Sequence, residues 1–450
     1  SSACGLKLVA FMVVECSLAE EHGSLRFHGV SRVGGTSLLA LLGVSGIAIT
    51  VGLPDGLLSP SLGSHREGHS HGSIADSRTE SVGVVVAMPF SIGSHGETPF
   101  FNIAQLTDEH EGEGPPNDEW KQDSRTLSTI QKVLTAERTN LSLVALTGDL
   151  VTGDHLFREV PKGKKTVPAY WADVAKAAHE FAGVPHVAIF GNHETMTAAY
   201  AKEGGMLLRG GRILRPELWR DGAALPGSIS PTTPFMSPDG TVSNFVLPLY
   251  HGNALAPSAL VWFLDTGGGE PEEGKMAGVR EWAIATSAAL AKGGKPLPSV
   301  VFMHIPSLSY IQASGGHAGT GVVSSLPRGC VGSANDDSIS TPRTSSSPKR
   351  GGRAGLEQQK VIEALVERGA RAIFVGHDHG NDWCCPASVA RVDVMHCWGR
   401  HSGYGGYSTP STSVRGSRIV RLEQSAEEAN LTVVTWVRLE DGRKIDELRW

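Results

Sequence analysis

Cysteine is scarce in this chain, and its spacing excludes two common kinds of site. The 450 residues include six cysteines and no C-x-x-C pair, so neither a zinc ribbon nor a thioredoxin-like motif is present. We therefore expect that cysteine does not carry the chemistry. A disulfide among Cys330, Cys384, Cys385 and Cys397 would suit an oxidising compartment, whereas free thiols are the alternative in a reducing one.

Long basic runs are also missing. The formal net charge is −6, the pI is near 6.3, and lysines and arginines gather only in short pieces such as Lys162 to Lys165. A groove that follows a polyanionic backbone needs a larger positive footprint than this. We therefore expect no nucleic-acid partner.

One stretch, residues 33–54, lacks charge altogether. Its sequence is VGGTSLLALLGVSGIAITVGLP, and about 20 uncharged, mostly apolar residues can span a bilayer or serve as a signal anchor. Its glycines weaken it as a helix, so the alternative is a core segment in a glycine-rich extension. We interpret it as an anchor, which predicts a membrane association at the amino terminus.

The first hundred residues differ from the rest of the chain, because they show little helical periodicity and none of the polar clusters described below. We divide the chain into an amino-terminal extension, residues 1–97, which holds the anchor and a linker, and a main domain, residues 98–450. Two N-x-[ST] sequons, at Asn140 and Asn430, are compatible with secretion. The expected location is the secretory pathway or a membrane to which the chain is anchored.

Five apolar runs of the main domain end in the same few polar residue types. They are FNIAQLTDEH with Asp108 and His110, LSLVALTGDL with Asp149, HVAIFGNHE with Asn192 and His193, SVVFMHIP with His304, and IFVGHDHGND with His377 and His379. Apolar runs of this length suit strands buried on both faces of a sheet. Ligands of open α/β sheets gather at the carboxyl ends of the strands, so the five clusters should converge within a few ångströms.

The types of these residues indicate a metal site. Mixed carboxylate, carboxamide and imidazole ligands suit zinc, iron or manganese better than calcium or a thiolate-held ion. Seven of these residues exceed the needs of one ion, so we expect two ions; the seven are Asp108, His110, Asp149, Asn192, His304, His377 and His379. A pair of metals roughly 3.5–4 Å apart clamps the attacking and leaving oxygens of an in-line displacement, which is the usual arrangement for phosphoester hydrolysis.

The spacing of the first three clusters predicts how their strands are arranged. Asp108, Asp149 and Asn192 are each about forty positions apart, enough for one strand–helix step of a βαβ unit. Residues 312–355, rich in serine, glycine and proline, should form a mobile loop beside the site. Asp265 ends another apolar run, but an aspartate followed by threonine and glycine is more typical of a turn than of a ligand.

In their order, the five blocks resemble the calcineurin-like metallophosphoesterase superfamily. The blocks are Asp108-x-His110, Gly148-Asp149, Gly191-Asn192-His193-Glu194, His304 and Gly376-His377-x-His379. The segments FLDTG (263–267), HIP (304–306), GHDHGND (376–382) and GRHSGYGGY (399–407) make the chain more similar to the purple-acid-phosphatase-like branch of plants and fungi. The resemblance covers residues 98 to 425 and implies a four-layer α/β/β/α sandwich in the α/β class.

The resemblance also implies a ligand assignment. One divalent ion would be held by Asp108, His110, Asp149 and His379, and the other by Asp149, Asn192, His304 and His377. Asp149 would bridge the two ions, whose identity as iron, zinc or manganese is left open. In the late block, Arg400 and His401 would contact phosphate oxygens, although a glycine-rich turn with ordinary surface residues is the alternative.

The implied activity is that of a binuclear metal-dependent phosphohydrolase acting on phosphomonoesters, with residues 98–450 as its catalytic domain. A hydroxide held between the ions would attack phosphorus in line, and His193 would act as general acid toward the leaving oxygen. The substrate would be a small phosphoester or a phosphoprotein. A phosphodiesterase of the same fold is one alternative, and a non-catalytic relative that uses the fold as a binding surface is another.

Three departures from the family pattern limit what the resemblance implies. The purple enzymes owe their colour to a tyrosinate in a Gly-Asp-x-x-Tyr block, and here Thr152 holds that position. Glu194 stands where this branch usually has aspartate, and Ser307-Leu308-Ser309 follows the HIP segment where Leu-Pro-Glu is common. We therefore expect no ferric tyrosinate, and we expect the last two departures to alter substrate contacts rather than metal binding.

Overall fold

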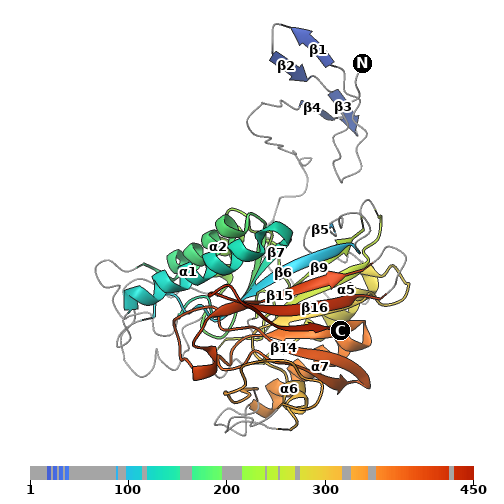
Figure 1. The fold of residues 1–450 in the computed structure, drawn as a ribbon. Coiled ribbons are helices and arrows are strands. Elements are labelled where there is room, and N and C mark those ends of the chain that lie inside the picture. Colours follow the sequence, from blue (N-terminus) through green and yellow to red (C-terminus); the bar gives the residue numbers. More distant parts are fainter. Residues whose placement is uncertain are drawn as a thin grey trace, which may run out of the picture. The chain divides into compact units, whose positions relative to one another are not determined.

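The computed structural model of the chain (Figure 1) describes residues 18–21, 24–27, 30–33, 36–39, 88–89, 98–113, 119–152, 165–194, 215–238, 241–251, 254–268, 274–316, 326–342, 351–424 and 430–450. The chain divides into two compact units, Ser1–Ser77 and Arg78–Trp450. In the first unit, two pairs of short strands are antiparallel: β1 (Leu18–Glu21) with β2 (Ser24–Phe27), and β3 (Val30–Val33) with β4 (Thr36–Leu39).

Most of the predicted anchor, residues 33–54, lies outside the described residues, and β4 is a short strand within it. Among the helices that the structure describes, none is both long and apolar enough to cross a bilayer. The short strand β5 (Met88–Pro89) precedes residue 98 and yet pairs with a sheet of the second unit. The anchor and the boundary at residues 97 and 98 stay predictions.

A six-stranded sheet carries the first three polar clusters. Its order is β17-β16-β15-β6-β7-β8, and its strands are β6 (Phe100–Leu106), β7 (Leu143–Thr147), β8 (His186–Ile189), β15 (Gly416–Glu423), β16 (Thr432–Leu439) and β17 (Lys444–Arg449). β6, β7 and β8 are parallel neighbours, which confirms that the first three clusters follow adjacent strands. Each is buried along its whole length, as their continuous apolar sequences predict.

Helices connect these strands, and a proline and a glycine mark the two ends of one of them. The helical elements of this layer are α1 (Glu119–Glu137), the 3-10 turn η1 (Arg138–Asn140), α2 (Val167–Ala182) and α4 (Arg215–Ala223). Helix α2 has a proline in its first turn and ends at Ala182. The next residue, Gly183, has a φ of 70°, and its N–H donates to the His179 carbonyl. That left-handed residue is the usual place for glycine after a helix. Figure 1 shows α1 and α2 lying together on one side of the six-stranded sheet.

A seven-stranded sheet carries the other two clusters, in the order β13-β14-β12-β11-β10-β9-β5. Its remaining strands are β9 (Phe245–Tyr250), β10 (Ala259–Leu264), β11 (Ser299–Met303), β12 (Ala370–Val375), β13 (Cys384–Val389) and β14 (Val392–Trp398). β10, β11, β12 and β14 are parallel. The other helical elements are α5 (Val279–Leu290), α6 (Ser309–Ala313), α7 (Gly351–Glu367) and the 3-10 turn η2 (Pro410–Thr412).

Two hydrophobic cores separate the layers. One cluster of buried side chains draws on both sheets and on α1 and α2, and the other draws on the seven-stranded sheet with α5 and α7. Along β10, Val261 and Phe263 join the first core, whereas Trp262 and Leu264 join the second, because successive side chains of a strand point to opposite faces. Two sheets flanked by helices make the four-layer α/β/β/α sandwich that the sequence predicts, and this prediction is confirmed.

Two disulfides lie at the β13 edge of the seven-stranded sheet, and one of them joins the segment 326–342 to that edge. Cys384 and Cys397 are directly paired residues of β13 and β14, and Cys330 is bonded to Cys385. Isolated bridges join Val331 to Cys384 and Asn335 to Asn381. The predicted disulfide among these cysteines is therefore present, and this part of the predicted mobile loop is tied to the sheet instead.

Candidate metal centre

The carboxyl ends of five strands, three from one sheet and two from the other, bring the predicted ligands together. The chain leaves β6 into Asp108 and His110, β7 into Asp149, β8 into Asn192, β11 into His304, and β12 into His377 and His379. Two groups of ligand atoms result, each with its members within 4.8 Å of one another: Asp108, His110 and His379, and Asp149, His304 and His377. Asn192 adjoins the second group, because its Oδ1 lies 2.9 Å from His377 Nδ1.

Asp149 lies between the two groups. Its Oδ2 is 2.9 Å from His304 Nε2 in one group and 3.8 Å from His110 Nε2 in the other. Asp108 completes the connection, since its Oδ1 is 3.6 Å from His379 Nε2 and 3.8 Å from His304 Nε2. The structure thus brings all seven predicted ligands to one place.

Strained backbone positions these residues. Asp108, His110, Asp149 and His377 have φ values of 62°, 50°, 54° and 80°, in the left-handed region that non-glycine residues seldom occupy. Such conformations carry an energy of about 1–3 kcal/mol each and persist only where the surroundings enforce them, most often at functional sites. Gly191 is required here because a Cβ would lie 2.3 Å from Asp149 Oδ1 and 2.6 Å from its backbone nitrogen.

Hydrogen bonds direct the imidazole lone pairs inward. His379 Nδ1 donates to the Tyr407 carbonyl (2.7 Å), so its Nε2 carries the lone pair, and this atom lies 3.2 Å from His110 Nε2. Burial lowers the pKa of both rings. When His110 Nδ1 donates to Thr152 Oγ1, 2.9 Å away, two neutral nitrogens face each other. A shared cation would stabilise that arrangement.

In the second group, a hydrogen bond likewise directs one imidazole nitrogen toward the other ligands. His304 Nδ1 donates to the Thr147 carbonyl (2.9 Å), which leaves Nε2 beside the Asp149 carboxylate. Burial alone would lower the pKa of His304, but the carboxylates of Asp149 and Asp108 raise it to about 9. A positive charge is therefore favoured at this position, and the donor set fits a metal cation as well as a proton.

Glu194 braces the loops that carry two of the ligands. Its carboxylate accepts hydrogen bonds from the backbone nitrogens of Asp149 (3.1 Å), Leu150 (2.7 Å) and Gly191 (2.6 Å). Burial and the nearby Asp149 carboxylate raise its pKa to about 7. These bonds show that Glu194 holds together the loops after β7 and β8. The altered substrate contact that the resemblance implied at this position stays a prediction.

A buried ion pair that the sequence did not predict supports the same loop. Arg215, the first residue of α4, donates to the Gly191 carbonyl (2.9 Å) and to Asp265 Oδ1 (2.6 Å). Asp265 also accepts from the nitrogens of Gly267, Val242 and Ser243. The Gly267 contact agrees with the turn that the sequence predicts at Asp265. The ion pair with Arg215, fifty positions earlier, could not be predicted from the sequence.

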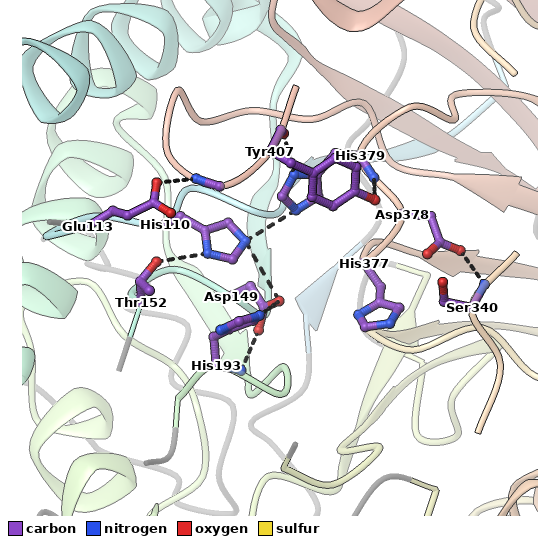
Figure 2. A pocket seen from close by; sticks show the side chains of 11 residues that line it. His110, Glu113, Asp149, Thr152, His193, Ser340, His377, Asp378, His379 and Tyr407 are labelled. Carbon is purple, nitrogen blue, oxygen red and sulfur yellow. Dashed lines mark hydrogen bonds and ion pairs between the residues drawn. The ribbon is translucent and has the colours of Figure 1, made fainter. Parts of the chain in front are cut away.

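A cavity of about 340 Å³ opens onto the ligands (Figure 2). Its wall includes His110, Glu113, Asp149, Thr152, His193, Ser340, His377, Asp378, His379, Gly406 and Tyr407. The side chain of His193 is 26% exposed, its Nε2 lies 4.0 Å from Asp149 Oδ2, and its backbone nitrogen donates to Asp149 Oδ1 at 2.8 Å. His193 therefore borders both the ligand cluster and the open cavity.

Arg400 and His401 do not line this cavity, contrary to the contact with phosphate that the sequence suggested. The Arg400 guanidinium is buried and donates to Asp382 Oδ2 (2.6 Å) and to the carbonyls of Ser411 and Val414. His401 is also buried, with its ring centroid 4.0 Å from that of His379. The glycine-rich segment turns these two side chains into the fold because Asp382 and His379 lie beneath it.

Comparisons with known proteins agree with the fold. The sequence model of the calcineurin-like phosphoesterase family matches residues 101–381, a range that includes all five polar clusters. The chain is 26% identical over 378 residues to "Probable inactive purple acid phosphatase 14" of Arabidopsis thaliana, covering 76% of this chain and 81% of that protein. It is 23% identical over 363 residues to phosphatase DCR2 of Saccharomyces cerevisiae, covering 76% of this chain and 54% of that one.

Among solved structures, purple acid phosphatase PPD1 from seeds of yellow lupin (Lupinus luteus) matches with a TM-score of 0.42 and 14% identity, over 79% of this chain and 54% of that chain. The chain therefore spans about half the length of the yeast and lupin proteins.

Proposed function

Because the chain belongs to the calcineurin-like phosphoesterase family, we propose that it is a metal-dependent phosphatase that hydrolyses phosphomonoesters. One observation carries the proposal: a full set of carboxylate, amide and imidazole ligands converges at one cavity, which His193 also lines. The ligands are Asp108, His110, Asp149, Asn192, His304, His377 and His379.

The proposed metal site follows the two groups of side chains. Asp108, His110 and His379 would hold one ion, Asn192, His304 and His377 would hold the other, and Asp149 would contribute to both. The facing imidazole nitrogens support this assignment, and the donor set suits iron, zinc or manganese. When bound, two such ions supply an activated water and neutralise charge on the phosphoryl oxygens.

His193 would supply the proton for the leaving oxygen. Its backbone bond to Asp149 holds it beside the ligand cluster, and its partly exposed ring faces the cavity where a substrate would lie. A histidine is suited to give up a proton near neutral pH, and general acid catalysis of this kind contributes roughly 10²–10⁴-fold.

The name of the Arabidopsis relative includes the words "probable inactive", so a non-catalytic protein that binds ligands through the same fold is the second candidate. The chain retains all seven predicted ligands and His193, which favours an enzyme. A phosphodiesterase is the alternative within the same chemistry, and one experiment separates all three.

That experiment measures metal content and hydrolysis on the same preparation. Elemental analysis of the wild-type protein should give two metal ions per chain, and phosphomonoesters should be hydrolysed faster than diesters. Asp149→Ala, which removes the shared ligand, should abolish both metal binding and turnover. Two bound metals with no turnover on either ester class would favour the binding protein, and faster diester cleavage would favour the phosphodiesterase.

The two disulfides indicate an oxidising location, such as the secretory pathway or the cell exterior. We propose that the substrate is a small phosphoester or a phosphoprotein met there, and that nucleic acid is not a partner. Whether residues 33–54 anchor the chain to a membrane can be tested by asking if a protein that comprises residues 1–450 partitions with lipid vesicles.

A further inference from the structure

The ring of one predicted ligand, His379, is held between two other rings. Tyr407 stacks on one side with centroids 4.1 Å apart and an angle of 6° between the planes. His401 lies against it with centroids 4.0 Å apart and an angle of 38°. Figure 2 shows the Tyr407 and His379 rings overlapping beside the other residues that line the cavity. His401 is buried, whereas Tyr407 is 49% exposed, so Tyr407 is the outer of the two contacts.

Tyr407 also contacts His379 through hydrogen bonds at both ends of the residue. Its backbone carbonyl accepts from His379 Nδ1 (2.7 Å), and its hydroxyl oxygen accepts from the His379 backbone nitrogen (2.9 Å). The first bond fixes which ring nitrogen carries the proton, and the stacked ring fixes the plane. Together they direct His379 Nε2 toward Asp108 and His110.

The segment that carries Tyr407 is itself anchored on both sides. The Tyr407 hydroxyl donates to Asp337 Oδ2, an atom that also accepts from the Gly380 backbone nitrogen (3.1 Å). On the other side, the Gly406 nitrogen donates to Glu113 Oε2 (2.5 Å). Gly406 has a φ of 66°, and a Cβ there would lie 2.5 Å from His379 Cε1 and 3.1 Å from His110 Cδ2. Only glycine lets the segment come this close to the two imidazoles.

We propose that Tyr407, held by Asp337, is a positioning residue that fixes the His379 imidazole and so sets the metal affinity of the group formed by Asp108, His110 and His379. The inference rests on the proposed metal site and adds to it the residue that orients one ligand. Residues that orient the ligands of a metal typically change metal affinity about 10–100-fold when they are altered. Among the residues that the structure describes, Tyr407 makes ring contacts and hydrogen bonds with His379 but none with His304 or His377, so the effect should be confined to one ion of the two.

The test compares two variants of Tyr407 with a matched control. Tyr407→Leu removes the stacked ring and the hydroxyl, Tyr407→Phe removes the hydroxyl alone, and Tyr404→Phe removes a hydroxyl from the same segment that donates to Glu440 instead. Each metal-free protein is titrated with Zn²⁺ by calorimetry, and metal per chain is measured after dialysis. Circular dichroism and the melting temperature of the metal-free proteins verify folding.

The carbonyl bond to His379 Nδ1 comes from the backbone and remains in each variant. We therefore expect Tyr407→Leu, which loses the stacked ring and the hydroxyl, to weaken one Zn²⁺ site about tenfold, at the low end of that range, and to retain about one ion after dialysis, with the other site unchanged. Tyr407→Phe keeps the ring and should weaken the same site by about 2- to 10-fold, as the loss of a hydrogen bond predicts. Tyr404→Phe should bind as the wild type does. Asp337→Asn should shift the same site in the same direction as Tyr407→Phe.

Two wild-type-like Zn²⁺ sites in a folded Tyr407→Leu protein would overturn the inference while leaving the proposed function intact. Equal weakening of both sites, or an equal effect of Tyr404→Phe, would also overturn it, because a general loss of structure would then be the cause. Failure of the wild-type protein to bind Zn²⁺ at all would contradict the proposed function itself.

Discussion

At the scale of single residues, His193 separates catalysis from metal binding. It follows the ligand Asn192, lines the cavity and lies beside Asp149 without joining either ligand group. We predict that His193→Ala keeps two metals and the fold while kcat falls roughly 10²–10⁴-fold on an alkyl phosphate. The loss should be smaller on p-nitrophenyl phosphate, because p-nitrophenolate leaves without a proton. Steady-state kinetics on both substrates check this, with metal analysis as the control.

An equal fall in kcat on both substrates would indicate that His193 binds phosphate and is not the general acid. An unchanged kcat on both substrates would favour the hypothesis of a non-catalytic protein.

Thr152 is the second residue with a direct consequence. It occupies the position of the tyrosinate in purple enzymes, and its Oγ1 lies beside His110 Nδ1. We predict that the protein loaded with ferric iron lacks the strong visible charge-transfer band of a purple phosphatase. An absorption spectrum of the iron-loaded protein decides the matter, and an intense band near the middle of the visible range would contradict it.

At the scale of secondary-structure elements, Arg215 joins the start of α4 to the loops after β8 and β10. Its partner Asp265 is fully buried, and Arg215 itself is 7% exposed. Removing one member of a buried ion pair leaves the other charge uncompensated and destabilises a protein by roughly 3–5 kcal/mol. We predict a loss of that order in the free energy of unfolding for Arg215→Met, measured by urea denaturation.

The control on the same helix is Arg220→Met, because the Arg220 side chain is 74% exposed beside Asp221. Its unfolding free energy should change by less than about 1 kcal/mol. Equal effects of the two variants would show that the ion pair does not hold the loop.

The buried His186 of strand β8 should make the stability of the fold depend on pH. Burial, with a smaller contribution from His179, lowers the pKa of His186 to about 4. Between pH 6.5 and 4 the unfolded chain therefore binds a proton that the folded chain excludes, so stability falls as the pH is lowered through this range. The full effect is about 3 kcal/mol. In metal-free protein, His186→Leu should lose less unfolding free energy than the wild type between pH 7 and 4. Parallel pH profiles for the two proteins would contradict the assignment.

At the scale of the whole molecule, the second compact unit starts at Arg78, ahead of the first ligand block. We predict that a truncated protein comprising residues 78–450 folds, binds two metals and turns over p-nitrophenyl phosphate within about twofold of the full chain. A second truncation that starts at Pro99 removes β5, the edge strand that pairs with β9, and it should be slightly less stable and equally active. Loss of turnover in the protein that comprises residues 78–450 would show that residues 1–77 belong to the catalytic unit.

The sequence by itself determined the strands and what stands at their ends. An apolar run and the polar residues that follow it are neighbours along the chain, so β6, β7, β8, β11 and β12 could be recognised together with Asp108, Asp149 and His377. Because parallel strands in one sheet align their carboxyl ends, convergence of these side chains followed from local information and a general rule of α/β folds. Length, charge and cysteine spacing could only exclude other classes.

Only the tertiary structure decided which residues hold the ligands in place. Glu194 braces nitrogens 44 and 45 positions away, Arg215 pairs with Asp265 across 50 positions, and Tyr407 reaches His379 across 28. Separation in sequence also explains why the predicted contact of Arg400 with phosphate was wrong. Its partner Asp382 lies 18 positions earlier and becomes its neighbour only after folding. A hydrogen bond between distant residues depends on the geometry of both layers at once, and no periodicity or motif in the chain encodes that geometry locally.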